Sequence, residues 1–201
     1  MKIALLDYGA GNVASVERAL QRLGAESQRV ATPECIANAD ALVLPGVGHF
    51  ETLIRALDDR KLRVPLLDAI SRGVPFLGIC LGLQALYAAS DEAPAMVGLQ
   101  LFPGGVRSLP AVVKLPHMGW NRLLMKNRSR LLEGLDADVY FYFAHTYAAV
   151  EQGQETVAVC NYGMEFVAVL EWENICAVQF HPEKSGEAGA QVLRNFLRLC
   201  A

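Results

Sequence analysis

The chain of 201 residues is about half hydrophobic (53%) and carries a formal net charge of −3. A chain of this size suits one domain over residues 1–201, and without a basic run neither nucleic acid nor an anionic membrane is expected as a main partner. The five cysteines are scattered, which favours neither a disulfide framework nor a zinc site. We therefore expect a cytoplasmic protein without a bound metal, a signal peptide or a membrane-spanning segment.

The first strand is expected at Ile3–Leu6 and the first helix from Val13 to Leu23, where apolar residues recur at helical spacing. Between them, Gly9-x-Gly11-x-x-Ala14 imitates a dinucleotide-binding fingerprint. Glu26 lies near the distance at which such sites place an acidic residue, but no clear strand ends there to present it to a ribose. We therefore expect no nucleotide cofactor.

A second buried strand at Ala41–Leu44 runs into the glycine-containing turn Pro45–Gly48, and helices are expected at Glu51–Leu57 and Leu66–Ser71. A third strand then leads to Cys80. This repeated order of strand and helix predicts an α/β fold with a mixed, largely parallel central sheet and helices on both faces. Because ligands of such sheets bind beyond the carboxyl ends of the strands, the Pro45–Gly48 turn and Cys80 are expected to converge.

Cys80 lies in a G-x-C-x-G pattern between that strand and a helix predicted from the spacing of Leu83, Leu86 and Tyr87. The pattern is that of a nucleophile elbow with sulfur in place of oxygen. The start of the following helix would favour the thiolate, and the N–H of Leu81 would point to where an oxyanion forms. The alternative is a buried structural cysteine before a glycine-rich turn, and the spacing favours the nucleophile.

From Gly98 onward, short apolar runs joined by turns predict antiparallel strands added to the parallel core. The runs are Leu99–Leu101, Val112–Leu115, Tyr140–Phe143, Thr156–Cys160 and Phe166–Leu170. The stretch Pro116–Asn121 interrupts them and contains Trp120. An indole in such a stretch is either a core anchor or an interface plug, and the composition alone favours the core anchor.

The last strand, Ile175–Phe180, ends at His181, and the helix Glu187–Leu199 closes the chain. A thiol nucleophile needs a base within reach, and the base needs an orienting partner. His181 is expected at the same carboxyl edge as Cys80, with Glu183 folded back onto the imidazole. A metal site made of the same three side chains is the rival interpretation, but it lacks a fourth ligand or paired spacing.

The pattern Gly78–Gly82 around Cys80 and the stretch His181–Glu183 resemble the motifs of the class I, or triad-type, glutamine amidotransferases. Within that family, further stretches resemble the glutaminase subunits of imidazole glycerol phosphate synthases, and the similarity spans nearly the whole chain. The stretches are Asp7–Asn12, Pro45–Gly48, Pro116–Asn121, Tyr142–Tyr147 and His181–Ser185. Ala144 departs from the family pattern, in which a larger aliphatic residue is commoner, and no departure falls on the triad positions.

The resemblance implies that Cys80 attacks the side-chain amide of L-glutamine to form a thioester, that His181 transfers the proton and that Glu183 orients His181. It implies an oxyanion hole formed by backbone N–H groups at Val47 and Leu81. It implies that the residues holding the substrate are Gly48, Gln84, Glu92, His145 and Thr146. It also implies that the residues facing a partner are Asn12, Trp120, Tyr142 and Lys184, which moves Trp120 from core anchor to interface. No cofactor is implied.

The implied partner is a (β/α)8-barrel cyclase subunit, which uses the ammonia to make imidazole glycerol phosphate in histidine biosynthesis. A physical argument agrees, because free ammonia is soon protonated and a useful glutaminase delivers it through a closed path. The alternatives are the glutaminase subunit of another synthase, such as pyridoxal 5'-phosphate synthase, a different thiol hydrolase on this fold, or a non-catalytic interaction module. The stretch Pro116–Asn121 argues against the first, and the intact Cys80, His181 and Glu183 argue against the last.

Overall fold

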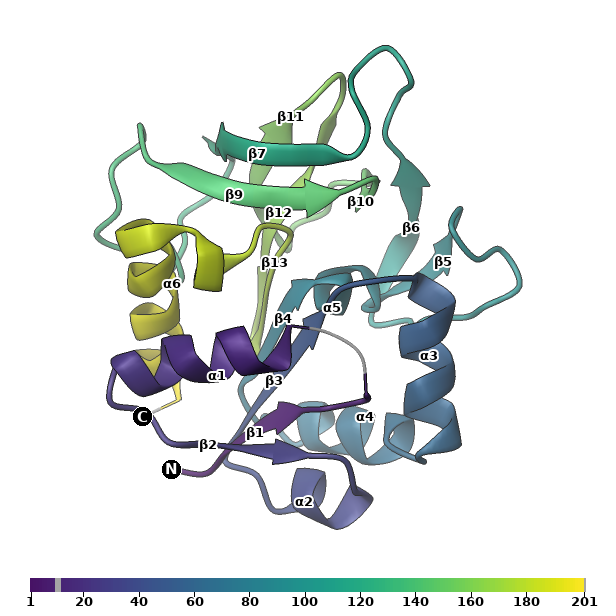
Figure 1. Cartoon of the computed structure of the whole chain (residues 1–201), viewed down its shortest axis with the longest axis vertical. Coiled ribbons are helices and arrows are strands. Elements are labelled where there is room, and N and C mark those ends of the chain that lie inside the picture. Colours follow the sequence, from purple (N-terminus) through teal and green to yellow (C-terminus); the bar gives the residue numbers. More distant parts are fainter. Residues whose placement is uncertain (10–11, 201) are drawn as a thin grey trace.

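The computed structural model describes residues 1–9 and 12–200, and within them it is centred on an eight-stranded sheet (Figure 1). The strand order is β2-β1-β3-β4-β13-β12-β11-β8. The strands from β2 to β13 run parallel, and β12, β11 and β8 are added in antiparallel fashion. In the same order, the strands span Ser27–Val30, Ile3–Leu6, Ala41–Gly46, Phe76–Cys80, Ile175–Val178, Glu165–Trp172, Thr156–Asn161 and Leu124–Met125.

Helices cover both faces of this sheet, as Figure 1 shows. On one face lie α1 (Val13–Arg22) and α6 (Gly186–Leu199). On the other lie α2 (Pro33–Ala37), α3 (Phe50–Asp59) and α4 (Arg63–Ser71). The predicted fold class, a mixed and largely parallel sheet with helices on both faces, is confirmed.

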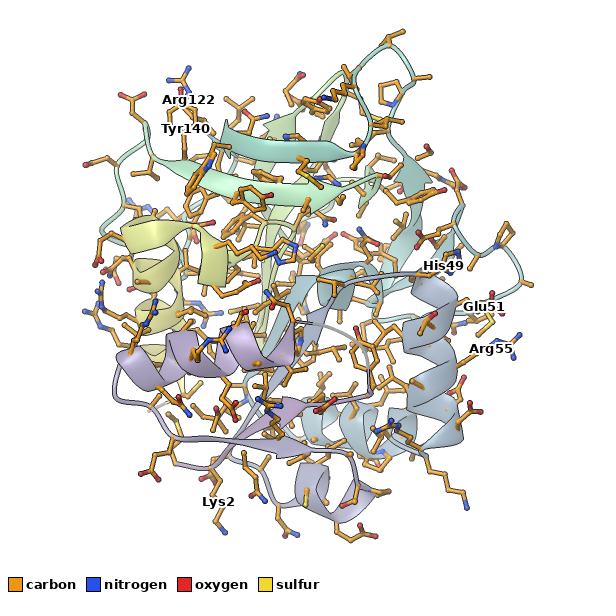
Figure 2. The ribbon with its side chains drawn as sticks, viewed as in Figure 1. Lys2, His49, Glu51, Arg55, Arg122 and Tyr140 are labelled. Atoms are coloured by element: carbon orange, nitrogen blue, oxygen red, sulfur yellow. The ribbon has the colours of Figure 1, made fainter. Side chains whose placement is uncertain are left out.

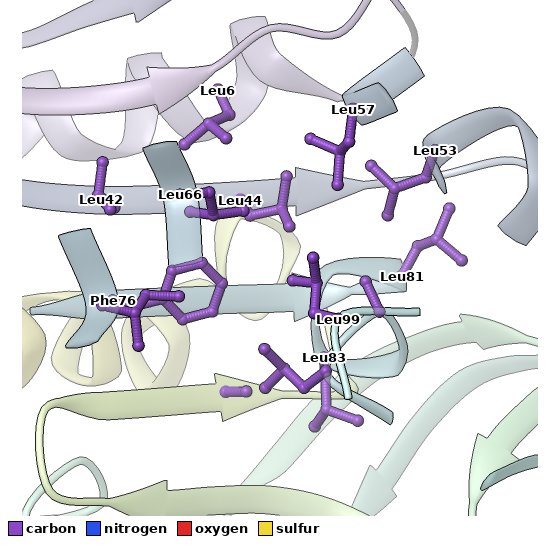
Figure 3. Packing of buried hydrophobic residues seen from close by; sticks show 14 of the residues in the cluster. Leu6, Leu42, Leu44, Leu53, Leu57, Leu66, Phe76, Leu81, Leu83 and Leu99 are labelled. Atoms are coloured by element: carbon purple, nitrogen blue, oxygen red, sulfur yellow. The ribbon is translucent and has the colours of Figure 1, made fainter. Parts of the chain in front are cut away.

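Alternation along the central strands explains why both faces need a cover. In β3, Leu42 and Leu44 belong to the hydrophobic cluster beneath α3 and α4, while Val43 belongs to the cluster beneath α1 and α6. Figure 3 shows Leu53 and Leu57 of α3 beside the end of β3 that carries Leu44. A strand that is apolar at every position must bury both of its faces, which is the behaviour of parallel sheets in α/β proteins.

Two smaller sheets lie beside the carboxyl edge of the parallel strands. In one, β7 (His117–Arg122) pairs antiparallel with β9 (Tyr140–His145). In the other, β6 (Phe102–Ser108) pairs with β5 (Tyr87–Ser90) and β10 (Tyr147–Ala149). The prediction that the later strands extend the parallel core is therefore confirmed for β11 and β12 and wrong for Tyr140–Phe143, which lies in β9 and belongs to a separate sheet. The strands β5, β6, β7 and β10 were not predicted.

Several local predictions need correction. The stretch Pro116–Asn121 does not interrupt the strands, because most of it forms β7. Neither Leu99–Leu101 nor Val112–Leu115 forms a strand. Val112 is 88% exposed in a turn between Pro110 and Pro116. The apolar side chains of Val112–Leu115 therefore do not form a strand that packs on the core. The elements β2 and α2 were not expected at all.

The helix after Cys80 is shorter than its sequence spacing suggests. It is the single turn α5 (Leu81–Gln84), and Tyr87 already belongs to β5. Leu86 and Tyr87 are both fully buried, so their spacing reflects burial on all sides rather than one face of a helix. The motif Gly9-x-Gly11-x-x-Ala14 falls partly on residues 10 and 11, which lie outside the described residues.

The strand register brings distant segments to one edge of the sheet. Gly46 at the end of β3 is paired with Cys80 at the end of β4, and Val178 at the end of β13 is paired with Ile79. Residues that directly follow β3 and β13 therefore lie on either side of Cys80.

No helix within residues 1–9 and 12–200 is both long and apolar enough to cross a membrane.

Candidate active site

Cys80 occupies a strained turn between β4 and α5. Its backbone has φ 54° and ψ −105°, a conformation that costs a non-glycine residue on the order of 1–3 kcal/mol. The neighbouring glycines allow this turn, because a Cβ at Gly82 would lie 2.0 Å from the carbonyl oxygen of Leu44, and a Cβ at Gly78 would lie 2.8 Å from that of Gly82. The predicted G-x-C-x-G geometry therefore has a steric cause, and it places the sulfur at the sheet edge.

His181 and Glu183 form a buried pair beside this edge. The side chains are 2% and 0% exposed, and His181 Nδ1 lies 2.8 Å from Glu183 Oε1. Because a carboxylate only accepts, Nδ1 carries the proton of this bond. Asn12 donates a second hydrogen bond to the same oxygen at 2.8 Å. The short 3-10 turn Pro182–Lys184 brings Glu183 back onto the ring, as predicted from the sequence.

The backbone of His181 is also fixed on both sides. Its N–H donates to the carbonyl of Tyr142 at 2.8 Å, and its own carbonyl accepts from the Ser185 hydroxyl at 2.7 Å. Burial lowers the pKa of His181, but the neighbouring Cys80 sulfur and the Glu183 carboxylate outweigh it and raise the pKa to about 10. A charged imidazolium beside a sulfur is the arrangement that stabilises a thiolate.

The sulfur opens onto a cavity of about 180 Å³. Besides Cys80, its lining contains every residue predicted for the oxyanion hole and for substrate binding, namely Val47, Gly48, Leu81, Gln84, Glu92, His145 and Thr146. The Glu92 carboxylate accepts the N–H of Phe50 at 2.8 Å and so caps the start of α3. The structure thus gathers these residues around the sulfur, while their individual roles stay predictions.

The four predicted partner-facing residues divide into two groups. Trp120 is 55% exposed on the outer face of β7, and Tyr142 meets it edge-on with ring centroids 5.9 Å apart. The Lys184 ammonium lies 5.7 Å from the centroid of the Tyr142 ring. Asn12, in contrast, points inward to Glu183. The expectation from composition that Trp120 anchors the core is therefore wrong.

The outer face of the β7–β9 hairpin carries further apolar side chains. Met118 is 65% exposed and Tyr140 is 49% exposed. Figure 2 labels Arg122 and Tyr140 at the rim of the hairpin, where the Arg122 guanidinium lies 5.6 Å from the Tyr140 ring centroid. The hairpin has this apolar face because its inward positions alternate with the outward ones.

Sequence reasoning missed that His145, which lines the cavity, pairs with a second buried histidine, His117. His145 Nδ1 lies 2.9 Å from the carbonyl oxygen of Tyr147 and therefore donates to it. His145 Nε2 must then accept, so His117 Nδ1, at 3.1 Å, is its donor. Burial lowers the pKa of His117 to about 4 and that of His145 to about 3, so both rings are neutral.

Gln179 was also missed. It lies in the predicted strand Ile175–Phe180 and is fully buried, and its Nε2 donates to Cys80 Sγ at 3.4 Å. An uncharged polar side chain in an otherwise apolar strand was the available signal, because a buried amide needs partners.

Within residues 1–9 and 12–200, no group of three or more His, Cys, Asp and Glu side chains is arranged to hold a metal ion.

Comparison with known proteins finds relatives that match nearly the whole chain. An imidazole glycerol phosphate synthase subunit HisH from Methanothermobacter thermautotrophicus is 50% identical over 197 residues, which cover 98% of this chain and 98% of that protein. The HisH subunit from Deinococcus radiodurans is 46% identical over 200 residues, covering 98% of this chain and 93% of the relative.

Solved structures show the same fold at lower identity. The crystal structure of a glutamine amidotransferase superposes with a TM-score of 0.79 at 21% identity, over 98% of each chain. PurLQS from Thermotoga maritima gives a TM-score of 0.78 at 21% identity, over 98% of this chain and 97% of that one. Residues 4–200 match the family model described as glutamine amidotransferase class-I. The chain therefore belongs to the class-I glutamine amidotransferase family, and within it to the HisH subunits of imidazole glycerol phosphate synthase.

Proposed function

We propose that the chain hydrolyses L-glutamine to glutamate and ammonia through a thioester on Cys80. The single observation that carries this proposal is the buried His181–Glu183 pair beside a sulfur that opens onto the cavity. The sulfur, as thiolate, attacks the side-chain carbonyl carbon of glutamine and forms a C–S bond. Charge then develops on the carbonyl oxygen, which the backbone N–H groups of Val47 and Leu81 stabilise.

His181 completes the reaction in two proton transfers. As the C–N bond breaks, the imidazolium gives its proton to the departing nitrogen, and ammonia leaves. A water molecule then attacks the thioester, His181 takes its proton, and glutamate leaves with the C–S bond broken. Glu183 keeps the ring in one orientation throughout, because it holds Nδ1 and leaves Nε2 to face the reacting groups.

The substrate is held in the cavity by side chains of complementary chemistry. The proposal assigns Glu92 to the α-ammonium group, because its carboxylate lines the cavity. Gly48 has φ +100°, so the turn after β3 can aim backbone N–H groups inward. Gln84, His145 and Thr146 line the same cavity and complete the set.

The ammonia is proposed to pass to a cyclase subunit with a (β/α)8-barrel fold. The relatives from Methanothermobacter thermautotrophicus and Deinococcus radiodurans are each one subunit of a synthase, which supports a second subunit here. Trp120 and Met118 are exposed on the face of the β7–β9 hairpin, which supplies an apolar docking surface close to Tyr142 and Lys184. The cyclase then uses the ammonia to form imidazole glycerol phosphate and an aminoimidazole carboxamide nucleotide.

The test is glutamine hydrolysis with and without the cyclase subunit and its nucleotide ligand. We expect low ammonia release from the chain alone and a clear stimulation by the loaded partner, and equal rates would refute the coupling. Cys80→Ala is expected to abolish ammonia release. Cys176→Ala is the matched control, because burial raises the pKa of that thiol to about 12 and it lies inside β13, away from the cavity.

A further inference from the structure

Gln179 is a fully buried side chain that directly follows β13. Val178 is paired with Ile79, so the next residue of each segment brings Gln179 level with Cys80. Gln179 Nε2 donates to Cys80 Sγ at 3.4 Å. His181 also neighbours the sulfur, which raises the pKa of its ring, but its Nε2 is buried without a hydrogen-bond partner.

The orientation of the Gln179 amide follows from an unambiguous carbonyl. Gln84 has one side-chain atom 2.7 Å from the carbonyl oxygen of Tyr147, and that atom must be its Nε2 because a carbonyl only accepts. The same Nε2 lies 3.1 Å from a side-chain atom of Gln179, which must therefore be Oε1. The remaining atom, Nε2, then faces the sulfur as a donor.

We propose that Gln179 is a positioning residue that holds the Cys80 sulfur as a thiolate and aims it into the cavity before substrate arrives. The proposal rests on the proposed function, in which this sulfur is the nucleophile. A hydrogen bond to a charged acceptor is stronger than one to a neutral acceptor, so the N–H of Gln179 favours thiolate over thiol. The donor is itself held by Gln84, which lines the cavity.

This arrangement divides two tasks between two neighbours of the sulfur. Gln179 supplies a donor that cannot give up its proton, so it can only hold the thiolate. His181 supplies a proton that is free to move to the departing nitrogen of the substrate. Gln84 links the two ends of the site, because it contacts both Gln179 and the backbone of Tyr147 at the cavity wall.

The test is alkylation of Cys80 by iodoacetamide in the absence of glutamine, followed by mass spectrometry across a range of pH. Gln179→Met keeps the approximate shape of the side chain and removes the donor. We expect alkylation near neutral pH to slow about tenfold and the midpoint of its pH profile to rise by about one unit. We also expect kcat for glutamine hydrolysis to fall more than KM rises.

The other titratable groups near the sulfur, His181 and Tyr8, are unchanged in this variant. Gln179→Glu is the second variant, in which a carboxylate near the sulfur should raise the midpoint further. Asn195→Leu is the matched control, because it also removes a fully buried amide, one that donates to Leu131 and Glu133 on the α6 side. It should leave the alkylation midpoint unchanged.

The outcomes separate this inference from the proposed function. An unchanged midpoint in Gln179→Met, or a rate lowered equally at every pH, would overturn the role of Gln179 while leaving the glutaminase proposal intact. Absence of ammonia release from the wild-type chain with its partner would overturn the proposed function, and the alkylation profile would still report on Gln179. If Gln179→Met does not fold, Gln179→Glu carries the same measurement.

Discussion

At the scale of single residues, the site depends on how Glu183 is held. Its Oε1 accepts from both His181 and Asn12, each at 2.8 Å, and its side chain is fully buried. Two donors on one oxygen fix the carboxylate, and the carboxylate in turn fixes the ring. Asn12 therefore holds the triad carboxylate in place, in addition to being a predicted partner contact. The sequence had indicated only the partner contact.

Replacing the carboxylate with an amide of the same shape tests this support. In Glu183→Gln the negative charge is lost, so we expect the raised pKa of His181 to fall. Ammonia release should fall by about a hundredfold, because the imidazolium is then less available as general acid. The pKa is measured by NMR titration of the His181 ring, and the rate by the ammonia assay.

The matched control is Glu187→Gln on α6, whose side chain is 81% exposed and paired with Arg194 on the surface. It should change neither measurement. Because the Cys80 sulfur also raises this pKa, the decisive result is the change: a His181 pKa in Glu183→Gln equal to that of the wild type would contradict the assigned role of Glu183.

Sequence patterns could select some of these residues and not others. Cys80 and the pair His181 and Glu183 each lie in a local pattern, in which spacing alone indicates a turn or a contact. The contact between Asn12 and Glu183 joins residues 171 positions apart, and that between Gln179 and Cys80 joins residues 99 apart. Such contacts depend on which strands become neighbours and in which register, and no local pattern records that.

At the scale of elements, the β7–β9 hairpin shows why one prediction failed. Its inward positions include His117 and Asn121, while its outward positions carry Met118 and Trp120. In β7 these polar side chains face inward and these apolar side chains face outward, which is the reverse of the usual alternation. The sequence pattern therefore does not indicate a strand with an apolar core face. His117 is accommodated inside because its ring stacks on Tyr162, with centroids 4.0 Å apart.

The buried histidine pair predicts a loss of stability in acid. The pKa of His117 is lowered to about 4 and that of His145 to about 3, both by burial, so the unfolded chain binds more protons than the folded chain below about pH 6.5. The free energy of unfolding should therefore decrease as pH falls from about 6.5 toward 4. In His117→Phe, one of the two groups is gone, and this slope should decrease by about 1.4 kcal/mol per pH unit.

The measurement is urea unfolding at several pH values between about 7 and about 4.5. Tyr162→Phe serves as control, because it removes only the bond from the Tyr162 hydroxyl to the carbonyl of Lys114 and keeps both histidines. Its slope should match that of the wild type. An identical slope in His117→Phe would show that this ring does not titrate as its burial indicates.

At the scale of the whole molecule, the parallel core and the added sheets contribute different things. The repeated order of strand and helix predicted the core correctly, because each central strand is apolar at every position and must be covered twice. The arrangement of β5, β6, β7, β9 and β10 into separate sheets could not be predicted, because their pairings are set by contacts with one another. Of these strands, β9 and β10 contribute residues to the cavity wall, and the sheet of β7 and β9 leaves one apolar face outside.

That apolar face leads to a prediction about assembly. Trp120 is 55% exposed on the hairpin beside the site, and Trp172 is 42% exposed at the far end of β12, where it pairs with Ile175 at the start of β13. Exposed indoles at protein interfaces often carry much of the binding energy. If the cyclase subunit docks on the hairpin, Trp120→Ala should weaken its binding by about thirtyfold or more, and Trp172→Ala should leave binding unchanged.

Each variant is titrated with the cyclase subunit by calorimetry, and its unfolding midpoint and solo ammonia release are measured in parallel. Because both indoles are exposed, neither substitution should lower the unfolding midpoint appreciably. Trp120→Ala should also lose stimulation at subsaturating partner while its solo activity stays the same. Equal affinities for the two variants would place the partner elsewhere on the surface, and a loss of affinity in Trp172→Ala alone would place it at the opposite edge of the sheet, where ammonia from Cys80 has no short path to follow.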